Sequence, residues 1–218
     1  MIRVEFSFDD GSIYDLRVAD MMASYGYNAT FYVPVNWQRY LLAKHIDPLT
    51  PNDLKNIASH FTLGSHGVNH ELLTRVSSET QDKEILGSML YWQEQGYNVQ
   101  SFCYPRGYFD EEIKKKVASA GYTNARTVKV GNLDPAVDEY ETKTTVHVGY
   151  DRDEYETDWL TYAKNKVTEA IEKHNNGEDV IYHAWGHSEE IHRYQQWDRF
   201  ATLLKIIRES LVDEDSIT

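Results

Sequence analysis

Strand-like and helical segments alternate along almost the whole chain, and this alternation restricts the possible folds more than any other feature. In the first strand-like segment, Arg3–Phe8, the apolar residues Val4, Phe6 and Phe8 alternate with polar ones, as in a half-buried strand. Seven such segments are expected, at about 3–8, 28–33, 61–64, 101–104, 123–127, 144–148 and 180–186. Amphipathic helices are expected at about 50–60, 77–96, 110–121, 157–177 and 196–210.

This regular alternation predicts parallel strand pairing with right-handed crossovers. The fold class is therefore α/β, either a barrel or an open doubly wound sheet. No internal repeat and no Gly/Ser/Pro-rich linker interrupts the chain, so we expect a single domain over residues 1–218. In both architectures, the side chains that carry chemistry gather at the carboxyl ends of the strands.

The charge balance and the cysteine count exclude several classes of partner. The chain has 22 basic and 35 acidic residues, a net charge of −13, which repels phosphate backbones, so no nucleic-acid partner is expected. No run reaches the roughly 20 apolar residues of a membrane span, and the N-terminus does not resemble a signal peptide. With one cysteine and no span, the expected location is cytoplasmic, or secreted if an N-terminal leader has been removed.

Two adjacent carboxylates follow the first predicted strand. Asp9 and Asp10 precede Gly11, and such a sequence is also typical of an ordinary turn. In a functional site, one carboxylate could bind a cation while the other acts as a general base.

A pair of histidines follows the third predicted strand. His66 and His70 are four residues apart, a spacing that lets two imidazoles bind one metal ion on a helical turn. The chain has nine histidines, and His183 and His187 share the same spacing, so the spacing alone does not distinguish a metal site from surface or core histidines. An aspartate with two histidines is, however, a three-ligand zinc arrangement that leaves one position open for water.

Four segments together resemble the ordered motifs of the polysaccharide deacetylase family, also known as the NodB homology domain or carbohydrate esterase family 4. The resemblance covers about residues 4–210, and its motifs are Ser7-Phe8-Asp9-Asp10-Gly11, Ser65-His66-Gly67-Val68-Asn69-His70, Tyr104-Pro105-Arg106-Gly107 and Trp185-Gly186-His187.

The resemblance implies a distorted (β/α)7 barrel with a divalent metal, usually zinc. By position, Asp9 matches the family's catalytic base, and Asp10, His66 and His70 match its metal ligands. The implied activity is that of a metal-dependent hydrolase of C–N bonds other than peptide bonds, which removes an acetyl group from an N-acetylated or O-acetylated sugar or polysaccharide.

The third and fourth motifs depart from the family pattern. The family has an arginine where this chain has Cys103, so the arginine that pairs with the base must come from elsewhere, and Arg126 is the candidate, with a plain surface arginine as the alternative. The backbone N–H near Arg106 could still stabilise an oxyanion. The motif that supports the catalytic acid has no clear counterpart, and Asp158-Trp159 is interpreted as helix capping and packing.

Two histidines compete for the role of catalytic acid. His183 and His187 lie on the same face of the last predicted strand, and the position at the strand's end favours His187 as the acid. Trp185 would then form a wall of the pocket for the acyl methyl group, and we place His183 and Tyr104 with the substrate-binding residues.

The predicted mechanism is attack of a metal-activated water, with Asp9 as general base and His187 as general acid. Two alternatives stay open. One is a hydrolase of a non-sugar linear or cyclic amide, and the other is a catalytically silent sugar-binding barrel.

Overall fold

A computed structural model describes residues 1–211 and shows seven parallel strands curled into a half-barrel. The strands form one sheet in the order β5-β4-β3-β2-β1-β7-β6, and every pairing between them is parallel. Their bounds are β1 Ile2–Asp9, β2 Thr30–Val33, β3 Thr62–Ser65, β4 Ser101–Cys103, β5 Asn124–Arg126, β6 Val146–His147 and β7 Val180–Gly186. All seven predicted strands are therefore confirmed. The predicted distorted barrel is also confirmed, and it has the form of a half-barrel.

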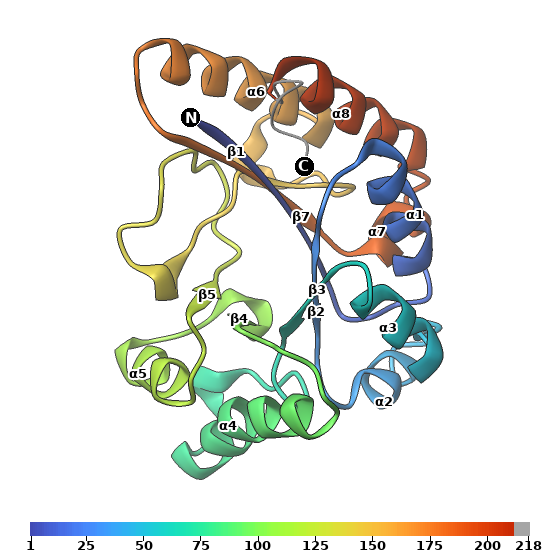
Figure 1. Cartoon of the computed structure of the whole chain (residues 1–218), viewed down its shortest axis with the longest axis vertical. Coiled ribbons are helices and arrows are strands. Elements are labelled where there is room, and N and C mark those ends of the chain that lie inside the picture. The colour runs from blue at the N-terminus through green and yellow to red at the C-terminus, as the bar shows by residue number, and fades with distance from the viewer. Residues whose placement is uncertain (212–218) are drawn as a thin grey trace.

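Helices surround the strands on the outside of the half-barrel (Figure 1). Their bounds are α1 Asp15–Tyr25, α2 Trp37–Leu42, α3 Pro51–Ala58, α4 Ser78–Glu94, α5 Glu111–Ser119, α6 Trp159–Asn175, α7 Ser188–Arg193 and α8 Trp197–Ser210. Five of them match predicted helices, whereas α1, α2 and α7 add to the predicted set. None of the helices within residues 1–211 has the length and apolar character needed to cross a membrane.

Local signals in the sequence explain where the helices begin. Thr50 caps α3 in a reciprocal capping box with Asp53, and Pro51 occupies the first helical position. Asp158 caps α6 by accepting the backbone N–H groups of Leu160 and Thr161, as expected. The acidic tail that the sequence predicts after Ser210 lies, from residue 212 on, outside the described residues.

The barrel is open between β5 and β6, and the segment between these strands spans the opening. The backbone N–H of Thr142 donates to the carbonyl of Ala125 at 2.9 Å, and that of Thr145 donates to the carbonyl of His183 at 2.8 Å. The segment thus borders both sheet edges. At the carboxyl ends of β1, β3, β4, β5 and β7, charged and polar side chains lie close together.

Candidate functional site

The metal-ligand candidates Asp10, His66 and His70 meet at the carboxyl ends of β1 and β3. Asp10 Oδ1 lies 3.7 Å from His66 Nε2 and 3.7 Å from His70 Nε2. Ligands about 2.0–2.1 Å from a tetrahedral zinc ion are roughly 3.3 Å apart, so small movements would bring these atoms around one ion. Asp10 Oδ1 is buried and has no hydrogen-bond partner, an arrangement that a bound cation would stabilise.

Both imidazoles of this cluster are in a state suited to metal binding. The Nδ1 of His66 lies 2.8 Å from the backbone carbonyl of Cys103, so Nδ1 carries the proton and the lone pair of Nε2 faces Asp10. Burial lowers the pKa of His66 and of His70, and each imidazole is therefore neutral at pH 7.

Glu84 of α4 holds the loop that carries His70. Its carboxylate accepts the backbone N–H groups of Val68 at 3.0 Å and of Asn69 at 2.9 Å. Gly67 in this loop has a φ of +79°, and a Cβ there would lie 2.8 Å from Glu84 Oε2, so only glycine fits. No local pattern in the sequence indicates Glu84, because the contact joins a loop to a helix.

Asp9 lies beside the metal-ligand cluster and forms a buried ion pair with Arg126. The Nη2 atom of Arg126 lies 2.5 Å from both carboxylate oxygens of Asp9, and the side chains of Asp9 and Arg126 are 2% and 1% exposed. Burial alone would raise the pKa of Asp9, but the charge of Arg126, together with that of His187, lowers it below its usual value. The Asp9 carboxylate is therefore held in its ionised form.

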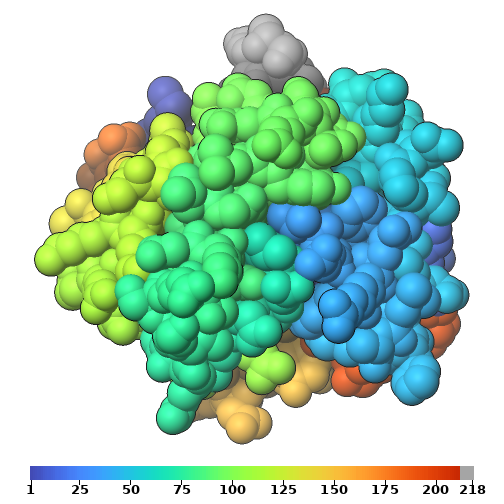
Figure 2. Space-filling model, turned by 90° about the horizontal axis from the view of Figure 1, so that it is seen from below, coloured from blue at the N-terminus to red at the C-terminus, as the bar shows by residue number. Residues whose placement is uncertain are grey.

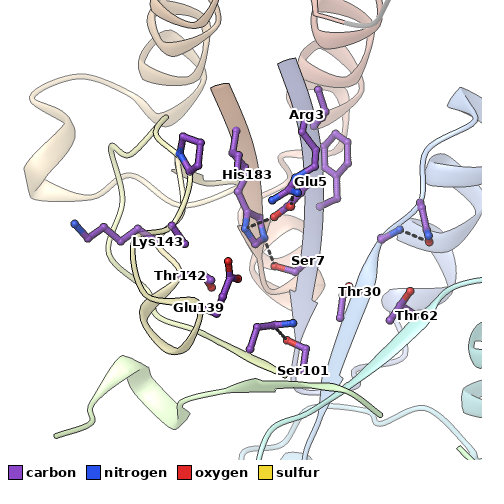
Figure 3. Close-up of a pocket in the computed structure, with 18 of the residues that line it drawn as sticks. Arg3, Glu5, Ser7, Thr30, Thr62, Ser101, Glu139, Thr142, Lys143 and His183 are labelled. Carbon is purple, nitrogen blue, oxygen red and sulfur yellow. Dashed lines mark hydrogen bonds and ion pairs between the residues drawn. The ribbon is translucent and has the colours of Figure 1, made fainter. Parts of the chain in front are cut away.

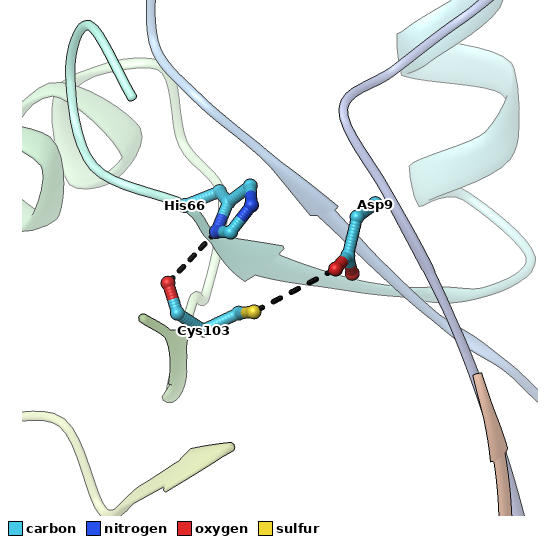
Figure 4. Close-up of side chains that lie close together, drawn as sticks. All are labelled: Asp9, His66 and Cys103. Atoms are coloured by element: carbon cyan, nitrogen blue, oxygen red, sulfur yellow. Dashed lines mark hydrogen bonds between the residues drawn. The ribbon is translucent and has the colours of Figure 1, made fainter. Parts of the chain in front are cut away.

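Cys103 fills the space next to this ion pair. Its sulfur lies 2.9 Å from Arg126 Nη2. It also lies 3.7 Å from Asp9 Oδ2, the contact that Figure 4 shows. Burial raises the pKa of the Cys103 thiol well above its usual value, so the thiol stays protonated and unreactive. The small side chain on β4 leaves room for the guanidinium that reaches Asp9 from β5.

His187 follows β7 directly and faces the cluster from the other side. Its Nε2 lies 4.0 Å from Asp10 Oδ2, and its Nδ1 lies 2.9 Å from Glu190 Oε2. Burial opposes the charged imidazolium, but the Glu190 carboxylate outweighs burial and, with Asp10 and Asp9, raises the pKa of His187 to about 10. His187 is therefore protonated at neutral pH.

Glu190 also bonds to a second histidine. His147 Nε2 of β6 lies 2.8 Å from Glu190 Oε2, and the His147 ring stacks on Trp185 with ring centroids 4.2 Å apart. Burial lowers the pKa of His147. The sequence analysis missed both residues; the three-residue spacing of His187 and Glu190 on a helical turn is the one local signal that could have indicated Glu190.

Trp185 lies between the Asp9–Arg126 pair and His147. Its side chain is 3% exposed, and the Arg126 guanidinium carbon lies 4.7 Å from its ring centroid. Trp185 thus packs against the Arg126 guanidinium on one side and His147 on the other.

Tyr104, one of the expected substrate-binding residues, lies away from the metal-ligand cluster. Tyr104 is completely buried, stacks on Phe109 and donates its hydroxyl to the carbonyl of Tyr140 at 3.0 Å. Its side chain packs in the core, and its placement with the substrate-binding residues stays a prediction. Arg106, in contrast, is exposed and has a φ of +58° at the turn after Pro105.

His183, also placed with the substrate-binding residues, lies away from the metal-ligand cluster. His183 Nε2 lies 2.8 Å from Ser7 Oγ and its Nδ1 lies 3.3 Å from Glu5 Oε2. These side chains border a cavity of about 830 Å³ at the amino ends of the strands, the end opposite to the metal ligands (Figure 3). Burial lowers the pKa of His183 to about 3, which favours the neutral imidazole at pH 7.

Residues 1–211 contain three groups of side chains whose ligand atoms lie close enough to hold a metal. In the group of Asp9, His66 and Cys103, the carboxylate is already paired with Arg126. In the group of His147, His187 and Glu190, the ligand atoms are hydrogen-bonded to one another. The group of Asp10, His66 and His70 has the unpartnered carboxylate oxygen, and it fits a divalent cation best.

A further buried carboxyl group, that of Asp15, belongs to a hydrogen-bonded network with Ser12 and Ser188. Ser12 Oγ lies 2.7 Å from Ser188 Oγ, which donates to Asp15 Oδ1 at 2.5 Å. Burial raises the pKa of Asp15 to about 8. This network links the start of α1 to the start of α7, next to His187.

Asp15 is expected to make the protein less stable as the pH rises. Between pH 4 and pH 8 the folded protein keeps a proton on Asp15 that the unfolded chain has lost, so the free energy of unfolding falls by up to about 1.4 kcal/mol per pH unit. Asp15→Asn should flatten this slope in urea unfolding at pH 5 and pH 8. Asp20→Asn, on the exposed side of the same helix, is the control and should leave the slope unchanged. Equal slopes for wild type and Asp15→Asn would contradict the assignment.

More than half of the chain matches a known family model. The model describes polysaccharide deacetylases and matches residues 2–125. Comparison with curated protein sequences gives no match.

Solved structures with the same fold include enzymes and a pseudoenzyme. A Streptococcus pyogenes deacetylase in complex with acetate is 22% identical, with a TM-score of 0.58 over 65% of this chain and 62% of that chain. The peptidoglycan deacetylase PdaC from Bacillus subtilis is 17% identical, with a TM-score of 0.60 over 95% and 83%. A family 4 carbohydrate esterase pseudoenzyme from Bacillus anthracis is 12% identical, with a TM-score of 0.63 over 97% and 62%.

The likeness to these solved structures establishes the fold and no more. The chain spans less than two thirds of the length of the Streptococcus pyogenes structure, and one of the three neighbours is a pseudoenzyme. Any activity must therefore be inferred from the candidate-site residues at the carboxyl ends of the strands.

Proposed function

Because this chain belongs to the polysaccharide deacetylase family, we propose that it is a metal-dependent hydrolase that removes acetyl groups from an acetylated sugar or oligosaccharide. The observation that carries this proposal is the buried, unpartnered carboxylate oxygen of Asp10 between two neutral histidines, next to an ionised Asp9. Asp10, His66 and His70 would hold a divalent cation, and zinc fits their two nitrogens and one oxygen. When bound, such an ion polarises a carbonyl group and lowers the pKa of a water molecule.

Asp9 acts as the general base in this proposal. Arg126 keeps its carboxylate charged, and Asp9 directly precedes the ligand Asp10. A charged carboxylate beside the metal ligands can take the proton of the attacking water. Arg126 is a positioning residue, since it holds Asp9 and does not reach the substrate.

His187 acts as the general acid that protonates the departing amine. Its pKa of about 10 keeps the imidazole protonated at neutral pH, and its Nε2 faces Asp10 while Glu190 accepts from Nδ1. The base and the acid thus have opposite charge states at the same pH, as a two-group mechanism requires.

The remaining cleft residues bind and orient the acetyl group. Trp185 offers an apolar wall for the methyl group. The backbone N–H of Arg106, at the turn after Pro105, is the donor proposed to stabilise the oxyanion.

Glu190→Gln is expected to lower kcat by about 10- to 100-fold with little change in KM. The amide cannot hold the imidazolium of His187 as the carboxylate does, and loss of such a partner impairs acid–base catalysis. Steady-state kinetics of acetate release measure the effect. Glu189→Gln is the matched control, because Glu189 pairs with Arg193 rather than with a histidine. Equal kcat values for the two variants would argue against a role for Glu190 in orienting His187.

Acetate release from a panel of acetylated compounds tests the proposed function. We expect zinc-loaded protein to release acetate from N-acetylated chito-oligosaccharides and not from linear or cyclic amides that lack a sugar. Release from the non-sugar amides alone would favour the alternative amide hydrolase. Sugar binding without acetate release would favour a silent barrel.

A further inference from the structure

A serine, a histidine and a glutamate form a row on the wall of the cavity at the amino ends of the strands. His183 Nε2 lies 2.8 Å from Ser7 Oγ, and His183 Nδ1 lies 3.3 Å from Glu5 Oε2 (Figure 3). All three residues line the cavity of about 830 Å³, a volume within the range of small-molecule sites. The proposed deacetylase mechanism uses none of them.

The register of β1 and β7 creates this row. Glu5 and His183 are Cα partners in the parallel pairing of the two strands, so their side chains lie side by side. Ser7 follows Glu5 by two residues on β1 and therefore points to the same face of the sheet. Backbone pairing in the middle of the sheet thus holds all three side chains in place.

Glu5 orients the imidazole of His183. One carboxylate oxygen of Glu5, Oε1, lies 2.8 Å from Arg3 Nε, and the other faces His183 Nδ1. An ionised carboxylate only accepts hydrogen bonds, so it favours the tautomer that carries the proton on Nδ1. The lone pair of Nε2 then accepts the hydroxyl proton of Ser7. Burial lowers the pKa of His183, which keeps this lone pair free at pH 7.

This arrangement has the parts of a site for nucleophilic acyl transfer. In such sites, a hydroxyl group lies within hydrogen-bond reach of a base, and a third group orients the base. The sheet uses the backbone N–H groups around Ser7, because β1 pairs with both β2 and β7 there. Thr30, the Cα partner of Ser7 on β2, also lines the cavity, and its hydroxyl is the donor for an oxyanion (Figure 3).

The same environment restricts the substrate to one that is easily cleaved. A single hydroxyl stabilises an oxyanion less than the paired N–H groups of a full oxyanion hole do. Burial also disfavours the imidazolium that forms when His183 takes the serine proton. Both effects favour an ester with a good leaving group over an amide.

The charges of the cavity are largely compensated, which favours a neutral ligand. Its ion pairs are those of Arg3 with Glu5, the Met1 amine with Asp179, and Asp134 with Lys173. Glu139 and Lys143, which also line the cavity, have opposite charges. None of the lining residues belongs to α2, α3 or α4, the helices that form much of the surface in Figure 2 (blue to green).

We propose that Ser7, His183 and Glu5 form an acyl-transfer site that hydrolyses neutral carboxylic esters with a good leaving group, such as aryl esters. The Ser7 oxygen forms a bond to the acyl carbon while its proton passes to His183 Nε2. The C–O bond to the leaving group then breaks, and the leaving oxygen takes that proton from His183. A water molecule attacks the Ser7 ester, gives a proton through His183 back to Ser7 Oγ, and releases the carboxylic acid. This activity is independent of the proposed deacetylase reaction.

Labelling of the full chain with a fluorophosphonate tests whether Ser7 is a nucleophile. Its oxygen should form a bond to phosphorus with loss of fluoride, to the same extent with and without zinc. Trypsin releases the peptide 4–17, which contains Ser7 and Ser12, and mass spectrometry of its fragments shows which serine is modified. We expect modification at Ser7 in wild type, none in Ser7→Ala, and a rate about 10- to 100-fold lower in Glu5→Gln.

The matched control is Ser101→Ala. It removes a hydroxyl group that lines the same cavity but bonds to Tyr32 instead of a histidine, so Ser7 should be labelled as fast as in wild type. Glu5 is 36% exposed, so Glu5→Gln retains the fold if Ser7→Ala does not.

Hydrolysis of p-nitrophenyl butyrate in the presence of EDTA separates this site from the metal-ligand cluster. Wild type should release p-nitrophenolate, and Ser7→Ala should not. Glu5→Gln should lower kcat by about 10- to 100-fold and leave KM unchanged, because Glu5 orients His183 and does not contact the ester. No modification of Ser7, modification of Ser12 in its place, or equal hydrolysis by wild type and Ser7→Ala would overturn the proposal.

Discussion

Asp9→Asn is expected to lower kcat for acetate release by about 10²- to 10⁴-fold, the usual contribution of a general base. Asparagine has nearly the same shape as aspartate but cannot accept the proton of the attacking water. Because Asp10, His66 and His70 are unchanged, the variant should still bind zinc. Stopped acetate assays with zinc-loaded protein measure the loss.

The control for Asp9→Asn is a measurement of folding under the assay conditions. Asparagine leaves the buried guanidinium of Arg126 without its counter-ion, so part of any loss could come from unfolding. Urea unfolding shows which fraction is folded, and the activity is corrected for it. A corrected kcat within a few-fold of wild type would contradict the role of Asp9 as base.

Arg126→Met is expected to lower the free energy of unfolding by about 3–5 kcal/mol. The substitution removes the partner of a carboxylate that is 2% exposed and leaves the charge of Asp9 buried and unpaired. It also removes the contacts of the guanidinium with the rings of Trp185 and Tyr32. Urea unfolding at pH 7 measures the change.

A double variant separates the ion pair from the packing. Asp9→Asn combined with Arg126→Met removes both charges, so it should be more stable than Arg126→Met alone. Arg152→Met, which breaks an ion pair with the exposed Glu154, is the matched surface control and should cost less than about 1 kcal/mol. A similar cost for Arg126→Met would mean that the buried pair contributes little.

The strand pattern made the fold predictable. Alternation in segments such as Arg3–Phe8, and short apolar runs near Ser101 and Val180, were enough to predict all seven strands. Each strand has its own local pattern, and the helices between strands indicate parallel pairing. The short α7 and the six-residue α2 were not foreseen, since helices of this length depend on tertiary packing more than on propensity.

The residues of the candidate site that belong to sequence motifs could be predicted. Those that reach the site only through long-range contacts could not. Asp10, His66 and His70 follow strand ends in recognisable motifs, and the structure brings them together. Glu84 and His147 act through long-range contacts that leave no local pattern. The position of Tyr104 after β4 does not reveal that its side chain turns into the core. The cytoplasmic location stays a prediction.

Zinc stoichiometry tests the central claim most directly. We predict about one zinc ion per chain in wild type, lost in His66→Ala and retained in Glu190→Gln, as measured by inductively coupled plasma mass spectrometry after dialysis. The two variants distinguish the cluster of Asp10, His66 and His70 from that of His147, His187 and Glu190. Zinc that persists in His66→Ala but is lost in Glu190→Gln, or no zinc in wild type, would contradict the account.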